Sequence, residues 1–112
     1  MDMVKFKRFD VCLVQLEPTV GSEINKTRPA IIVSPDSMND SRLKTIIIAP
    51  MTSTVRDHFP TRVDINFKNK KGQVAIDQLR AIDRSRIIKV LGHTDEETET
   101  NILNILSIMF NR

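Results

Sequence analysis

The sequence predicts a mainly β domain, a small antiparallel barrel or sandwich, that ends in one α-helix. Three observations lead to this prediction: short runs rich in Ile and Val, regular turn signals between them, and apolar residues at helical spacing near the C-terminus. With 112 residues, 40% hydrophobic and 28% charged, the chain is expected to form a single folded domain over 1–112 with one modest core.

Short segments between turn signals are predicted to form the strands, at 9–17, 29–33, 45–51, 61–67, 73–82 and 86–91. Within the fourth segment Val63, Ile65 and Phe67 alternate with polar residues, so one face of that strand should contact water. Turn signals separate the segments at Pro18 with Gly21, at Pro35-Asp36 and along 68–72. A single helical turn is expected over 36–40.

The C-terminal helix carries the strongest local signal. Thr94 followed by Glu97 has the spacing of a capping box, and Asp95 and Glu96 suit the positive end of a helix dipole. Apolar residues then recur at helical spacing, at Ile102, Ile105, Leu106, Met109 and Phe110. The acidic run is therefore explained as the start of a helix.

Charge and cysteine content limit the function classes. The formal net charge is +3, but without the acidic helix start and the last residues the balance up to residue 93 is +6, which suits a polyanionic partner. The single cysteine, Cys12, lies in an apolar run, cannot form a disulfide within the chain and fits a reducing cytoplasm. No signal peptide or membrane-spanning stretch is apparent, so a cytoplasmic protein is expected.

Metal and histidine chemistry find little support in the residue pattern. Two histidines and one cysteine provide no zinc-ligand cluster. The sequence also contains no Asp-x-Asp pair of the kind that would indicate a magnesium site. His58 and His93 would suit a two-histidine ribonuclease, but the interpretation as a loop residue and a helix-entry residue is favoured. Polar residues at strand ends, among them Arg28 before Pro29 and Thr52 after an apolar run, remain as candidates, with ordinary turn chemistry as the alternative.

Four blocks of sequence resemble the successive motifs of the MazF/PemK toxins, in the same order and with similar separations, over about 10 to 91. They are LEPTVGSE (16–23), KTRPAIIVSPDSMN (26–39), IIAPMTS (47–53) and DQLRAIDRSRI (77–87). The resemblance implies an SH3-like barrel of the CcdB/MazF type with a C-terminal helix and one short helix. It further implies a homodimer, without cofactor or metal, that cuts single-stranded RNA and leaves a 2′,3′-cyclic phosphate and a 5′-hydroxyl. A cognate antitoxin, an acidic and partly disordered peptide, would silence it by occupying the RNA groove.

By position, the arginine of the family's T-R-P motif is Arg28 and the threonine of its P-x-T-S motif is Thr52, which the resemblance implies to be the catalytic pair. Glu23, Ser53 and Gln78 match positions associated with RNA contact, and Lys26 is expected to add a positive charge there. Many members have Gln-Gly-Gly where this chain has Ile-Asn-Lys at 24–26, so the loop should be stiffer and more basic.

Arg28 can offer two parallel hydrogen bonds to a phosphorane, but an arginine holds its proton tightly and is an awkward general base. Glu23, His58 and solvent stay open as the acceptor of the proton. The alternative function is that of a CcdB-like toxin, which binds DNA gyrase without catalysis. The T-R-P and P-x-T-S blocks favour the ribonuclease.

Overall fold

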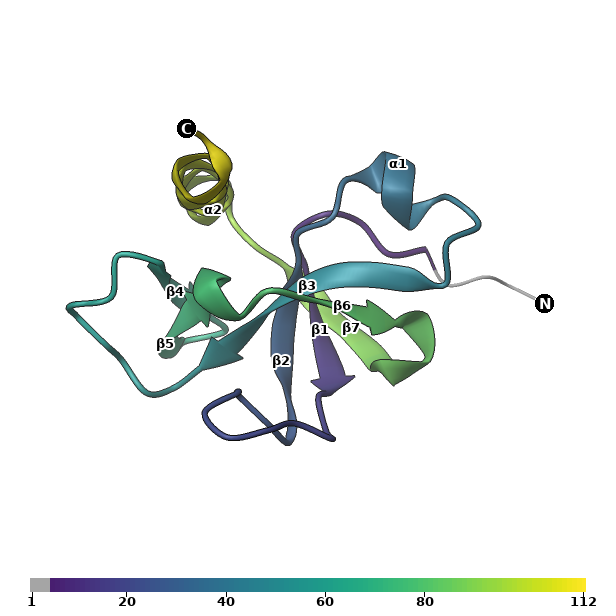
Figure 1. The fold of residues 1–112 in the computed structure, drawn as a ribbon, viewed down its shortest axis with the longest axis horizontal. Coiled ribbons are helices and arrows are strands. Elements are labelled where there is room, and N and C mark those ends of the chain that lie inside the picture. The colour runs from purple at the N-terminus through teal and green to yellow at the C-terminus, as the bar shows by residue number, and fades with distance from the viewer. Residues whose placement is uncertain (1–4) are drawn as a thin grey trace.

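The computed structural model describes residues 5–112 as one curled antiparallel sheet with a helix on one side (Figure 1). The strands are β1 (Asp10–Gln15), β2 (Thr27–Ile32), β3 (Thr45–Thr52), β4 (Arg62–Phe67), β5 (Lys70–Ala75), β6 (Arg80–Asp83) and β7 (Ile87–His93). The α-helices are α1 (Asp36–Asn39) and α2 (Glu96–Phe110), and two 3-10 turns are η1 (Ile76–Gln78) and η2 (Arg84–Arg86). The predicted mainly β fold with a C-terminal helix and one short helix is confirmed.

The strands follow the order β4-β5-β3-β2-β1-β7, with β6 pairing beside β3. β3 contacts three other strands: its first four residues pair with β6, residues 48–50 pair with β2, and its last two pair with β5. The ends of the order approach each other through side chains: a Cβ on Gly92 of β7 would lie 2.9 Å from the ring of Phe67 in β4. The sheet is therefore curled into a half-barrel.

The central strands bury side chains on both of their faces. One core cluster consists of Phe9, Val11, Ile31, Val33, Ala49, Val63, Ile65, Val74, Ile76 and Ile102. The other consists of Phe6, Cys12, Val14, Leu16, Ala30, Ile32, Ile46, Ile48 and Ile82. Neighbouring residues of β1 and β2 enter different clusters, so both faces of these strands are apolar. This explains why they appear in the sequence as continuous apolar runs.

The buried Cys12 matches its interpretation as a small hydrophobe. Burial, with a smaller contribution from Asp10, raises the pKa of its thiol to about 12.

The prediction of a single strand over 73–82 is wrong. It comprises the end of β5, the turn η1 and most of β6. The turn expected along 68–72 is also too long, because only Lys68 and Asn69, both with positive φ, connect β4 to β5. Two successive residues with positive φ form the tight hairpin turn that matches strand twist, so β5 can begin at Lys70.

The C-terminal helix is confirmed, but its predicted capping box is wrong. The N-cap is Asp95, whose carboxylate accepts a hydrogen bond from Thr98 N at 2.8 Å, while Thr94 Oγ1 is buried without a hydrogen-bond partner among the described residues. α2 packs on β4 and η1, with Ile102 fully buried.

No helix within residues 5–112 is both long enough and apolar enough to span a membrane.

Candidate functional site

Arg28 lies near the start of β2, where Pro29 follows it and keeps its backbone extended. The side chain is half-buried, and its Nε donates a hydrogen bond to Asn25 O at 2.7 Å. Nη1 and Nη2 take part in no hydrogen bond within residues 5–112. The guanidinium is therefore held by one nitrogen, and its two terminal nitrogens can bind a ligand.

Thr52 is the last residue of β3 and is buried, with 8% of its surface exposed. Its Oγ1 accepts a hydrogen bond from Thr54 N at 3.1 Å, which orients the hydroxyl and leaves its proton available to donate. The backbone is held by β5, where Thr52 lies opposite Gln73. The Oε1 of Gln73 accepts from Arg56 N at 2.9 Å and thus also fastens the loop that follows Thr52.

The strand register brings Arg28 and Thr52 to the same place. Ala30 of β2 lies opposite Pro50 of β3. Extending this antiparallel register by two residues places Arg28 opposite Thr52, where β3 leaves β2 and begins to pair with β5. Two residues far apart in the sequence therefore share one end of the β2–β3 pair.

Both residues line one cavity of about 250 Å³. The lining residues are Arg28, Pro29, Met51, Thr52, Ser53, Phe67, Lys70, Lys71 and Gly72. Three of them are cationic, and none of the described residues in the lining is acidic, so the cavity is suited to an anion. Ser53, a predicted RNA contact, is exposed at its edge.

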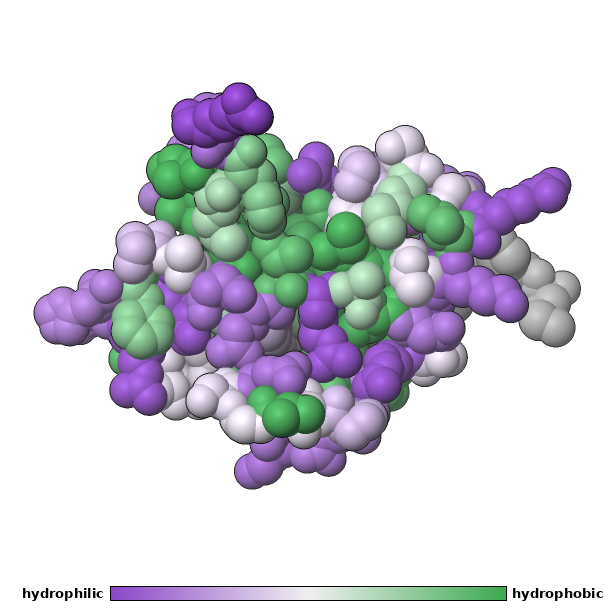
Figure 2. All heavy atoms as spheres, viewed as in Figure 1, coloured by the Kyte–Doolittle hydropathy of each residue, from purple (hydrophilic) through white to green (hydrophobic). Residues whose placement is uncertain are grey.

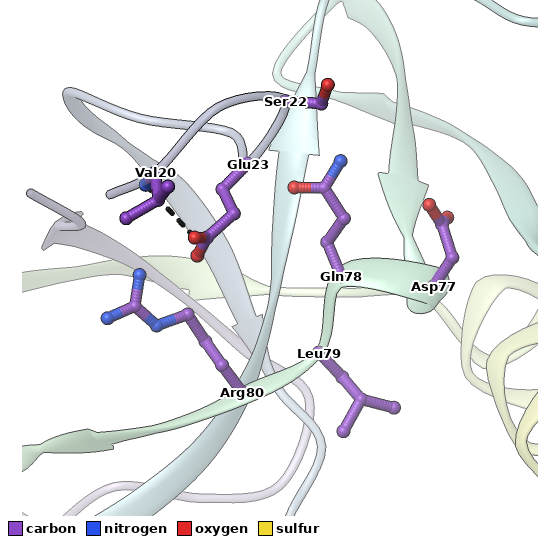
Figure 3. A pocket seen from close by; sticks show the side chains of 7 residues that line it. All are labelled: Val20, Ser22, Glu23, Asp77, Gln78, Leu79 and Arg80. Carbon is purple, nitrogen blue, oxygen red and sulfur yellow. Dashed lines mark hydrogen bonds between the residues drawn. The ribbon is translucent and has the colours of Figure 1, made fainter.

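Glu23 and Gln78 line a second hollow, of about 550 Å³, between the loop after β1 and the turn η1 (Figure 3). Glu23 Oε1 accepts a hydrogen bond from Val20 N at 3.0 Å, which folds the loop on itself. Arg80 of β6 also lines the hollow and donates from Nη1 to Leu16 O at 3.0 Å. The hollow thus offers carboxylate, amide and guanidinium groups, a set that can bind polar edges of a base.

The two cavities share no lining residue, but the loop before β2 forms a hydrogen bond with one lining residue of each cavity. Ile24 N donates to Gln78 Oε1 at 2.6 Å, and Asn25 O accepts from Arg28 Nε. Lys26 lines neither cavity; it is exposed, and its φ of 69° is a conformation that glycine adopts more easily. The loop therefore couples the position of Gln78 to that of Arg28.

The two histidines do not meet in this site. His58 is exposed in the loop between β3 and β4. His93 ends β7, where Nδ1 lies 2.9 Å from Asp10 Oδ1 and Nε2 lies 2.9 Å from Glu99 Oε1 of α2. The hydrogen bond to Asp10 raises the pKa of His93 most, burial lowers it less, and Glu99 adds to the rise. Within residues 5–112 no three His, Cys, Asp or Glu side chains are grouped as metal ligands.

Several lining residues are not among the site residues that the sequence predicts. Phe67, Lys70, Lys71 and Gly72 line the cavity of Arg28 and Thr52, although residues 68–72 were interpreted as a turn. The signal that could have identified them is the density of lysines in this short stretch, directly after a strand. Their approach to Thr52 depends on the pairing of β5 with β3, which no local pattern specifies.

Comparison with known proteins identifies the family. The family model of PemK-like, MazF-like toxins of type II toxin–antitoxin systems matches residues 7–110. Endoribonuclease EndoA of Bacillus subtilis (strain 168) is 29% identical over 106 residues, which cover 91% of each chain.

Solved structures also share the fold, and two of them illustrate the likeness. MazF from Deinococcus radiodurans superposes with a TM-score of 0.82 at 22% identity, over 96% of this chain and 97% of that one. A mycobacterial endoribonuclease in complex with its cognate antitoxin has a TM-score of 0.76 at 20% identity, over 95% and 97% of the chains. Since the family model spans nearly the whole length, the chain belongs to the PemK-like, MazF-like toxins of type II toxin–antitoxin systems.

Proposed function

We propose that this protein is an endoribonuclease that cuts single-stranded RNA without a metal ion, with Arg28 and Thr52 as its catalytic residues. Family membership and the relative named as an endoribonuclease support ribonuclease activity. The observation that carries the proposal is that Arg28 and Thr52, from different strands, line the same cationic cavity. Glu23, Lys26, Ser53 and Gln78 are proposed to contact the RNA.

In the proposed reaction a ribose 2′-oxygen attacks the phosphorus on its own 3′-oxygen. The 2′-oxygen–phosphorus bond forms, the bond from phosphorus to the 5′-oxygen of the next nucleotide breaks, and that oxygen takes up a proton. The products are a 2′,3′-cyclic phosphate and a 5′-hydroxyl. A base removes the proton of the attacking 2′-hydroxyl. Negative charge grows on the non-bridging phosphate oxygens while phosphorus has five ligands.

Arg28 and Thr52 are suited to stabilise that charge. The terminal nitrogens of Arg28 can donate two parallel hydrogen bonds to the phosphorane oxygens. The Thr52 hydroxyl, whose acceptor side is used by Thr54 N, donates a third. Donors already oriented toward developing charge typically contribute about 3 to 4 kcal/mol each to lowering a barrier. No step of the reaction requires a metal.

The proposal includes the partners and the place of action. A cognate antitoxin, an acidic and partly disordered peptide, is proposed to occupy the cationic cavity and so exclude RNA. The mycobacterial neighbour, an endoribonuclease with its cognate antitoxin, supports this partner class. The toxin is proposed to act as a homodimer in the cytoplasm, where RNA and antitoxin are present.

The test is cleavage of a long transcript by the purified protein, with the ends of the products mapped. We expect cuts in single-stranded regions, cyclic phosphate and 5′-hydroxyl ends, and equal rates with and without EDTA. Arg28→Ala should abolish cleavage while its circular dichroism spectrum stays that of the wild type. Strong inhibition by EDTA would contradict the metal-free reaction, and full activity of the variant would contradict the role of Arg28. Intact RNA would favour gyrase binding instead.

A further inference from the structure

The cavity of Arg28 and Thr52 has a second cationic side, contributed by the first two residues of β5. Lys70 and Lys71 line it together with Gly72. Both lysines are exposed, and neither forms a salt bridge within residues 5–112. By contrast Lys68, in the hairpin turn, lies over the ring of Phe67 with Nζ 5.4 Å from its centroid and does not line the cavity.

The fold holds this cationic side close to the catalytic residues. Gly72 allows the approach, because a Cβ there would lie 2.6 Å from Thr52 O. The pairing of Met51 with Val74 and of Thr52 with Gln73 continues the contact between β3 and β5. The tight turn at 68–69 lets β5 begin at Lys70, so both lysines belong to a paired strand.

A cavity of about 250 Å³ is small relative to a nucleotide chain. One phosphate at Arg28 and Thr52 therefore leaves the neighbouring phosphates at the rim, where successive phosphates of a single strand follow at intervals of one nucleotide. Flexible lysines at such a rim suit a diffuse phosphate chain, whereas the planar guanidinium of Arg28 suits the oriented charge of one phosphorane.

From these observations, and resting on the proposed function, we infer that Lys70 and Lys71 form a phosphate-binding subsite for the nucleotides that flank the scissile phosphate. The subsite acts through charge on the binding of RNA. It takes no part in the chemical step.

The experiment compares wild type with the double variant Lys70→Gln/Lys71→Gln in two assays. The first measures kcat and KM for a cleavable RNA. The second measures the Kd of a single-stranded 2′-O-methyl oligonucleotide, which cannot be cut because its 2′-oxygens are blocked, over a range of salt concentrations. Each lost phosphate contact reduces the slope of log Kd against log salt by about 0.7 for a single strand.

We expect the double variant to have a several-fold higher KM with an unchanged kcat, and a slope about 1.4 smaller than that of the wild type. Lys70→Arg/Lys71→Arg should restore the wild-type slope, because it retains both charges. The matched control is Lys44→Gln, which removes an exposed charge at the opposite end of β3, about 25 Å from Thr52 along the strand. It should leave the slope as it is.

An unchanged slope in the double variant, an equal loss in Lys44→Gln, or a loss of kcat alone would overturn the inference. The two assays also separate it from the proposed function. If the wild type binds the oligonucleotide in a lysine-dependent way but cuts no RNA, the phosphate-binding subsite stands and the proposed ribonuclease activity fails.

Discussion

At the scale of single residues, the candidate site depends on how two side chains are already held before a substrate binds. Arg28 uses Nε on a backbone carbonyl, and Thr52 uses its acceptor side on a backbone N–H. Each therefore has an oriented donor that remains available. Preorganised donors of this kind stabilise charge in a transition state without a reorganisation cost at the moment of reaction.

We predict that Thr52→Val lowers kcat by about 100- to 1000-fold, because it removes the hydroxyl donor and keeps the side-chain shape. Thr52→Ser retains the hydroxyl and should lose much less. Single-turnover cleavage at saturating enzyme measures this difference. If Val and Ser at position 52 are equally active, Thr52 does not donate to the transition state.

At the scale of elements, the pairing of β3 with β5 and the docking of α2 on the sheet decide the geometry. The site lies where β3 exchanges one partner strand for another, so a small shift of β5 must move Thr52. The helix is connected to the sheet by His93, whose ring lies between Asp10 of β1 and Glu99 of α2.

Gly72→Ala is expected to reduce cleavage more than its loss of stability explains. The new Cβ would meet the backbone oxygen of Thr52 at 2.6 Å, so β3 and β5 must move apart at the site. Ile82→Val serves as the control, since it destabilises a buried position of β6 by about 0.5 to 1.5 kcal/mol away from the cavity. Rates compared at temperatures where both variants are folded decide the question; similar rates for the two variants would contradict the positioning role.

The contribution of His93 to stability should depend on pH in a defined direction. Because folding raises its pKa, protonated His93 stabilises the folded state fully below its ordinary pKa of about 6.5, and the effect disappears as pH rises through the raised value. Urea unfolding of wild type and His93→Gln should therefore differ more at about pH 6 than at about pH 9. His58→Gln, at an exposed loop residue, provides the control. A difference that is the same at both pH values would contradict the linkage.

At the scale of the whole molecule, the surface is divided by character. Figure 2 shows apolar side chains gathered between α2 and α1 on the face in view, and mostly hydrophilic residues along the opposite edge. Near the end of α2, Ile108 and Phe110 are each 72% exposed. Contiguous apolar surface on a folded domain is typical of sites that bind another protein.

We predict that the protein is a homodimer in solution. Light scattering after size exclusion should give about twice the chain mass of 12.8 kDa at micromolar concentration. Association would cover apolar groups of a domain too small to bury them all by itself. A mass equal to that of one chain under these conditions would contradict the dimer.

Local patterns in the sequence determined most of the elements. Alternation predicted the strand at 61–67, the Ile-rich runs predicted the buried strands, and helical spacing predicted the C-terminal helix. They failed where neighbouring signals compete. Thr94 and Asp95 can both cap the helix, and only the position of Thr98 N beside Asp95 decided between them. Over 73–82 a turn between two strands has no distinct local signal, because its Ile76 is buried as a strand residue would be.

The motifs identified Arg28 and Thr52 as candidates from the sequence alone, since the T-R-P and P-x-T-S blocks are local. That the two share one end of the β2–β3 pair and one cavity followed only from the pairing of β2 with β3. The cationic side at Lys70 and Lys71 followed only from the pairing of β5 with β3. Strand pairing joins residues far apart in the chain through backbone hydrogen bonds, which are the same for nearly every residue type. The sequence therefore determined which side chains are available, and the tertiary structure decided which of them share a cavity.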